Sequence, residues 1–355
     1  MPFPKFDPKK VRQLPLSERQ DRMTFQKIKY LDESVPPINN PEVEQEIDGL
    51  AKKIAEAYRN NRPVIWMTGD HATIKRGNQR YLIDLMRRGI VTHLAGNGAV
   101  PIHDFELALM GSTSEDVEFY VRDGKFGNWD EVGFAINEAA KWAAELGWGF
   151  GETIGWMIER DRFGFKFPHK DISVFAAAYR LNVPATVHVL IGADIVHQHP
   201  NMDGAATGKA TYTDFLIFAR ALAGLEGGVF LSLGTAVHGP EVYLKALSMA
   251  RNVELQEGRK NVLNFTTAVF DILDLGNWRE SQKEIYDWRR DTKVLDEGDE
   301  EHFDSRYYFR PGKTILTRTV AGGFGHSFYI KGNCSITIPN LYHRIIKELG
   351  LFPNE

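Results

Sequence analysis

Cysteine is nearly absent from this 355-residue sequence, which contains Cys334 alone. A single cysteine cannot form an intramolecular disulfide or a cysteine-based zinc site, and it fits a reducing compartment. Long apolar runs are missing too, since no stretch approaches the roughly 18 residues that a membrane span needs. The first 45 residues are polar and lack the apolar core of a signal peptide. We therefore expect a soluble, cytoplasmic protein that makes no contact with membranes.

An excess of charge is also lacking. The formal net charge is −4, and no stripe of Lys and Arg follows any expected helix, so nucleic acid is not an expected partner. Three familiar ligand motifs are absent: the full G-x-G-x-x-G dinucleotide fingerprint, the phosphate-binding G-x-x-x-x-G-K-[ST] loop and the G-x-S-x-G nucleophile turn. The glycines Gly96 and Gly98 supply only part of the first motif.

Proline punctuates residues 1–40, which carry six prolines among charged side chains. This arm has too few apolar residues to fold alone, so it must pack on the body of the protein or on a neighbouring subunit. We expect it to pack on another subunit of a homotetramer. No convincing linker divides the remainder, and residues 41–355 are expected to form a single domain.

Helical and strand-like patterns alternate along that domain. Apolar runs typical of buried strands occupy residues 63–68, 90–94, 183–191, 229–233, 261–270 and 328–330. Segments with helical periodicity include residues 75–88, 129–146, 212–225 and 240–251, and a last helix is expected at 339–349. Strands separated by helices of 10–15 residues indicate βαβ units. The sequence thus predicts an α/β fold with a mostly parallel sheet and helices on both faces.

Small residues cluster where these strands are expected to end. The turns are residues 68–71, 95–104, 192–194, 233–236 and 266–268. Parallel sheets bind ligands outside the carboxyl ends of their strands, and glycine lets the backbone approach a ligand closely. Turns use glycine and small polar residues in any case. Five such turns in one sheet nevertheless favour a cofactor site.

Three histidines fall within twelve residues: His188, His197 and His199, with Asp194 and Asp203 nearby. Histidines and carboxylates at this spacing could ligate zinc or iron. The competing interpretations are a polar lining of a ligand pocket and, for His188 in an apolar run, a buried core histidine. We favour the pocket lining and expect no metal.

The ordered set of strands and turns resembles the deoxyhypusine synthase family, most closely its bacterial deoxyhypusine synthase-like branch. The resemblance is carried by residues 62–71 (RPVIWMTGDH), residues 89–104 (GIVTHLAGNGAVPIHD) and the later segments 183–184, 227–236 and 266–268. It implies a Rossmann-like NAD-binding fold, a homotetramer, and NAD-dependent transfer of an aminobutyl group from a polyamine such as spermidine to an amine acceptor. The residues it places at the cofactor are Asn97, Gly98, Ala99, Asp194, Gly234, Thr267 and Ala268.

Two positions are implied to be catalytic. His238 lies beside a histidine position of the family's substrate site. The pair Gly312-Lys313 resembles the family's W-G-K lysine motif but lacks its tryptophan. A transferring lysine would form an imine, which needs a free amine. Lys313 could equally be a surface lysine before a strand. Ile102 and His103 replace two family glutamates, which argues against modification of a translation factor. The alternatives are an NAD-dependent amine oxidoreductase without covalent transfer and an inert NAD-binding scaffold.

Overall fold

A six-stranded sheet forms the centre of the computed structural model, which describes residues 3–258, 262–276, 278–279, 309–320 and 325–352. The strand order is β5-β3-β2-β6-β7-β8, and every pair in this sheet is parallel. The strands are β2 (Val64–Thr68), β3 (His93–Asn97), β5 (Ala185–His188), β6 (Val229–Leu233), β7 (Thr266–Asp271) and β8 (His326–Lys331). The predicted α/β class with a mostly parallel sheet is confirmed.

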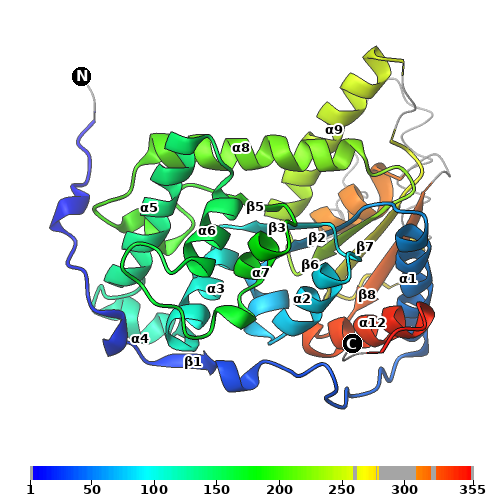
Figure 1. Cartoon of the computed structure of the whole chain (residues 1–355), viewed down its shortest axis with the longest axis horizontal. Helices are drawn as coiled ribbons and strands as arrows, with labels where there is room; N and C mark the ends of the chain where they lie inside the picture. The colour runs from blue at the N-terminus through cyan, green and yellow to red at the C-terminus, as the bar shows by residue number, and fades with distance from the viewer. Residues whose placement is uncertain (1–2, 259–261, 277, 280–308, 321–324, 353–355) are drawn as a thin grey trace.

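Helices connect the strands and cover both faces of the sheet (Figure 1). They are α1 (Pro41–Arg59), α2 (Gln79–Arg87), α3 (Ala99–Met110), α4 (Val117–Arg122), α5 (Asp130–Leu146), α6 (Phe150–Glu159), α7 (Val174–Arg180), α8 (Gly204–Ala223), α9 (His238–Gln256) and α12 (Cys334–Glu348). Short helical turns are η1 (Pro8–Lys10), η2 (Leu16–Glu18), η3 (Phe25–Lys27), η4 (His71–Lys75), η5 (Lys170–Ile172), η6 (Ile195–Gln198) and η8 (Gly312–Arg318).

Alternation along the strands builds a separate core on each face. Successive side chains of a strand point to opposite faces, so in β2 Ile65 and Met67 join the cluster of α8 and α9, whereas Val64 and Trp66 join that of α1, α2, α3 and α12. All five residues of β2 are buried because both faces of this central strand are covered. In Figure 1, α8 and α9 lie along one side of the sheet, and α1 and α12 stand together beside β8.

The N-terminal arm runs along the body of its own chain (Figure 1). Its strand β1 (Asp21–Thr24) pairs antiparallel with β4 (Ser112–Glu115), and Leu16, Met23 and Ile28 are buried in the core. Arg19 is buried as well, between Asp21 at 2.7 Å and Glu106 at 2.6 Å. The arm therefore packs on the body of its own chain, which is one of the two placements considered from the sequence. A homotetramer stays a prediction.

Several element boundaries differ from the sequence expectation, and two of them have a clear physical reason. Residues 90 and 91 do not begin β3, because their N–H groups donate to the carbonyl of Leu85 and close the end of α2. The last helix begins at Cys334 rather than Pro339, because the Asn333 side chain caps it by accepting from Ser335 N. Pro339 is then an interior helical residue. Among the described residues, no helix has both the length and the apolar character to cross a bilayer.

Gly69, which follows β2, should tolerate no side chain. A Cβ built there would lie 2.3 Å from the carbonyl oxygen of Gly234, a backbone atom that cannot swing away. We expect Gly69→Ala to lower the free energy of unfolding by about 2 kcal/mol, the usual scale of overpacking. Urea denaturation would measure the loss.

Gly208 is the matched control. It lies inside α8 with no atom within 4 Å of its built Cβ. Because alanine has the higher helix propensity, Gly208→Ala should raise stability by about 0.5–1 kcal/mol. Equal stability of the two variants would contradict the close packing of the Gly69 turn.

Candidate functional site

The chain reverses its direction of travel through the sheet between β2 and β6. From β2 it proceeds outward through β3 to β5, and then it returns to β6 on the other side of β2 and continues to β7 and β8. This is the strand order of doubly wound dinucleotide-binding folds, in which ligands bind at the carboxyl ends beside the reversal. At that point Gly69 N donates to Leu233 O at 2.9 Å, and Gly234 N donates to Phe270 O at 3.0 Å. The turns after β2 and β6 therefore meet backbone to backbone.

Helices that begin beside this reversal lack side-chain caps. The first residues of η4, α3 and α9 follow Asp70, Gly98 and Val237, and none of these three caps the helix with a side chain. By contrast, Asn40, Asp203 and Asn333 cap α1, α8 and α12 at the same edge. In α9, Thr235 Oγ1 accepts from Gly239 N at 2.9 Å, so that helix keeps part of its first turn satisfied. Uncapped N–H groups are free to bind an anionic or hydroxyl ligand.

Two carboxylates approach the same point from different turns. Asp70, after β2, lies 2.9 Å from Lys75 Nζ and 3.6 Å from His103 Nε2. Burial alone would raise the pKa of Asp70, but the charges of His103 and Lys75 outweigh burial and lower that pKa below its ordinary value. Asp70 is therefore ionised at neutral pH.

Asp194 arrives from the loop after β5 and packs on Gly98. A Cβ on Gly98 would lie 2.0 Å from Asp194 Oδ2, so only glycine leaves room for this carboxylate. Burial, and after it the charge of Asp70, raises the pKa of Asp194 to about 7. The two carboxylates therefore differ in protonation around neutral pH, as paired groups of acid–base sites do.

His238, the first residue of α9, reaches over the carboxyl ends of the central strands. Its ring forms a hydrogen bond with the backbone of His188, which ends β5, although β2 and β3 separate β5 from β6. The Nε2 atom of His238 is buried and has no hydrogen-bond partner. The side-chain oxygens of Asn97 and Ser232 are buried and unpartnered in the same way. By strand alternation, Asn97 and Ser232 lie on the face that α8 and α9 cover.

Most residues predicted to contact a cofactor come together at this edge. Asn97 ends β3, Gly98 and Ala99 begin α3, and Asp194, Gly234 and His238 lie in the next turns. Thr267 and Ala268 do not. The segment 266–268, expected as a turn, is the first half of β7, where Thr267 Oγ1 donates to Ile315 O at 3.0 Å and Ala268 is wholly buried. Lys313 lies in the first turn of η8, near Arg310, which pairs with Glu241 of α9.

The histidine cluster divides into separate environments. His188 is a core residue: it is 3% exposed, its Nε2 lies 3.2 Å from Thr186 Oγ1, and burial lowers its pKa to about 3. His197 Nδ1 accepts from Asp194 N, and His199 Nε2 lies 2.8 Å from Gly127 O. Within the described part of the chain, no three His, Cys, Asp or Glu side chains are grouped as metal ligands would be.

A buried polar chain behind Asp70 was not anticipated from the sequence. His103 Nδ1 lies 2.7 Å from Thr113 Oγ1 and 3.5 Å from Glu106, which pairs with Arg19 of the arm. Burial raises the pKa of Glu106 in isolation, but Arg19 and His103 lower it to about 2. Asp70 stood in a turn selected as a ligand site, so its position could have suggested a role. Nothing in residues 1–40 indicated that Arg19 would be buried.

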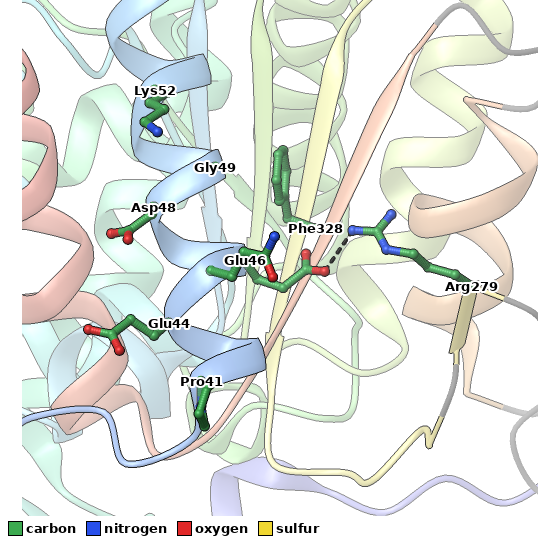
Figure 2. Close-up of a pocket in the computed structure, with 9 residues that line it drawn as sticks. Pro41, Glu44, Glu46, Asp48, Gly49, Lys52, Arg279 and Phe328 are labelled. Carbon is green, nitrogen blue, oxygen red and sulfur yellow. Dashed lines mark hydrogen bonds and ion pairs between the residues drawn. The ribbon is translucent and has the colours of Figure 1, made fainter.

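The described cavities lie elsewhere. One of about 650 Å³ opens between α1 and β8 and contains the Glu46–Arg279 ion pair at 2.6 Å (Figure 2). Figure 2 shows Glu44 and Asp48 on the same helix pointing away from that pair. Another, of about 640 Å³, lies beside Pro184 and Ala185, where β5 begins. Neither includes the residues at the reversal, so volume does not select the candidate site.

Comparison with known proteins gives fold-level likeness only. No protein-family model and no curated protein matches the chain. Among solved structures, it is similar to ArgZ, a cyanobacterial arginine dihydrolase, at 14% identity and a TM-score of 0.46 over 87% of this chain and 32% of that one. It is also similar to AgrE, solved with ornithine and NAD⁺, at 15% sequence identity and a TM-score of 0.46; the match covers 90% of this chain and 34% of AgrE. A putative LOR/SDH protein from Methanococcus maripaludis S2 is similar at 15% sequence identity and a TM-score of 0.44; the match covers 92% of this chain and 74% of that protein.

These findings correct the predicted family. The similar structures are arginine dihydrolases and a LOR/SDH protein, not deoxyhypusine synthases, so the prediction of that family is wrong. Aminobutyl transfer from a polyamine and the transferase class are wrong with it, and a catalytic role of Lys313 stays an untested prediction. Thr267 and Ala268, which the resemblance places at the cofactor, lie inside β7. The chain spans about a third of the length of ArgZ and AgrE. At these low sequence identities, the substrates of those proteins are not assigned to this chain.

The contact between Gly98 and Asp194 predicts an energetic coupling. Gly98 has φ −63° and ψ −19°, which alanine adopts without strain, so Gly98→Ala should act only by displacing the Asp194 carboxylate. We expect it to cost about 1–3 kcal/mol of stability in the parent and almost nothing in an Asp194→Ala background. A double-mutant cycle by urea denaturation measures the difference.

Gly204→Ala, at the start of α8 with open space around it, supplies the control, because its effect should be the same in both backgrounds. Additive effects of Gly98→Ala and Asp194→Ala would show that the two residues do not touch.

Proposed function

We propose that the chain binds NAD at the carboxyl edge of its sheet, beside the reversal between β2 and β6, and uses it in a redox reaction of a small molecule. The observation that carries the proposal is the strand order, with glycine turns meeting at the reversal. Folds with this strand order bind dinucleotides outside the carboxyl ends of the strands that flank the reversal.

The residues at this edge fit a dinucleotide. Gly69 and Gly98 let the turns of this edge pack closely on one another. The first turns of α3 and α9 contain Pro101 and Pro240, which have no N–H, so their donors for phosphate or ribose oxygens are the N–H groups that precede these prolines and are not already bonded. The unpartnered buried atoms of Asn97, Ser232 and His238 can bond ribose hydroxyls or a carboxamide. The turn after β2 differs from the usual fingerprint, because Asp70 and a five-residue helical turn replace its glycines.

When bound, NAD would supply the hydride acceptor. The chain's own residues would do the rest: Gly234 and its neighbours admit the cofactor, His238 donates or accepts a hydrogen bond through Nε2, and Asp70 presents a fixed negative charge held by Lys75. The carboxylate suits a cationic or hydroxylated substrate. A redox enzyme is favoured over an inert scaffold because two carboxylates of different protonation face this edge.

Removal of the His238 ring should weaken cofactor binding. His238→Ala deletes one unpartnered nitrogen at the start of α9 and leaves the uncapped helix in place. A lost hydrogen bond of about 1 kcal/mol corresponds to a roughly fivefold increase in the Kd for NAD⁺. Isothermal titration calorimetry measures the change.

His343→Ala is the matched control, because His343 also has a buried, unpartnered Nε2 but lies on α12 beside Tyr81. It should leave the Kd unchanged. Absence of NAD⁺ or NADH binding by the parent at millimolar concentration would overturn the proposed function. Binding without NADH formation across a panel of amines and alcohols would favour the scaffold.

A further inference from the structure

Three turns and one helix bring a mixed set of ionisable groups to a single point of the proposed cofactor edge. Asp194 comes from the loop after β5, Asp70 from the turn after β2, and His103 from α3. Lys75 and His71 belong to η4, and His197 follows Asp194 in η6. Among these groups, the charge of Asp70 acts on Asp194, whereas Lys75, His103 and His71 surround Asp70.

The members of this set are fixed in different ways. Asp70 is held by Lys75 at 2.9 Å and faces His103 at 3.6 Å, so its charge is compensated and its position is constrained. Asp194 has no ion pair within 4 Å among the described residues. Its carboxylate accepts a hydrogen bond from the backbone of His197, which caps η6, and lies against the bare backbone of Gly98. The neighbouring Asn97 has a buried, unpartnered side-chain oxygen in the same turn. The cofactor edge therefore holds one carboxylate with an ion pair, one without an ion pair, and an unpartnered acceptor.

Resting on the proposed function, we infer that Asp194, which packs on Gly98 at the cofactor edge, is the catalytic proton acceptor of the redox reaction, with Asp70 as the neighbouring fixed charge. The substrate class follows from the balance of the step. A molecule with an H–C–O–H or H–C–N–H group loses its C–H hydride to the nicotinamide and its O–H or N–H proton to the Asp194 carboxylate. The products are a carbonyl or imine, NADH and a protonated Asp194. In the reverse direction the same carboxyl group returns the proton.

Acid–base work at neutral pH needs a group that titrates there. The burial of Asp194 and the nearby Asp70 charge raise the pKa of Asp194 to about 7, so both of its forms are populated. Asp70 cannot serve, since His103 and Lys75 keep its pKa low. His188 cannot serve either, because it is buried in the core with Thr186.

The position of Asp194 has a consequence for binding that needs no turnover. If its carboxylate faces the reactive end of the cofactor, the positive nicotinamide ring of NAD⁺ favours the ionised form and lowers its pKa in the complex. Binding then releases a proton below about pH 7. Affinity should therefore rise by at least about threefold as pH increases from about 5 to 7, and then level off. NADH, whose ring is neutral, should show a smaller dependence.

Calorimetry of NAD⁺ binding between about pH 5 and pH 8, in buffers of different ionisation enthalpy, tests this directly. Asp194→Asn should bind NAD⁺ with little pH dependence and without proton release. Asp194→Ser is a second variant, in case the larger amide of Asp194→Asn disturbs the contact with Gly98. It should show the same loss of pH dependence. In Asp70→Asn, affinity should level off at a lower pH, because one neighbouring negative charge is gone. Asp123→Asn removes an exposed carboxylate paired only with Arg122 and should match the parent.

The outcomes separate the two proposals. No binding of NAD⁺ or NADH at any pH overturns the proposed function and this inference together. Binding that is independent of pH, or that weakens as pH increases toward 7, overturns the role of Asp194 alone. Weakening would place a phosphate rather than the nicotinamide ring beside Asp194. The same pH profile in Asp194→Asn as in the parent would assign the proton to another group.

Discussion

The backbone contact between the turns after β2 and β6 is the constraint on which the site depends. Gly69 N bonds to Leu233 O, and the space beside Gly69 is filled by the carbonyl of Gly234. Because neither position has a side chain, the carboxyl ends of two non-consecutive strands are held at fixed separation. The turns on either side, with Asp70, Gly98 and His238, inherit their positions from this contact. A close-packed sheet does not deform continuously, so the site is positioned by the core rather than by its loops.

Buried charge is the second organising feature. Arg19, Glu106, His103 and Asp70 form a polar chain from the arm to the edge of the sheet. Buried ion pairs add little net stability compared with apolar packing, yet removal of one partner is costly because it leaves the other charge unpaired. We therefore infer that these buried polar contacts serve to orient side chains rather than to add stability. They hold His103 behind Asp70, and they make residues 14–28 part of the body rather than an appendage.

The sequence predicted the layered fold well, because period-2 and helical patterns report directly on burial. Buried β2 and β6 and the helix expected at 129–146 appear where predicted. The site was predicted in part: Asn97, Gly98 and Asp194 do come together, since strand ends of a parallel sheet share one edge. Thr267 failed as a turn residue because composition does not distinguish a small polar turn from a small polar strand interior. Arg19 and Glu106 are 87 residues apart and carry no local pattern, so only the tertiary structure reveals their pairing.

The packing of the arm also bears on how the chain folds during synthesis. Residues 14–28 are synthesised before their partners, which are Glu106, the strand β4 and Trp129, about a hundred residues later. Until those segments emerge, Arg19 has only Asp21 as a counter-charge, and Leu16 and Met23 have no core to enter. Long-range contacts of this kind slow folding, since loop closure comes before any gain in stability. Residues 14–28 must therefore wait for segments made much later before they can reach their place in the fold.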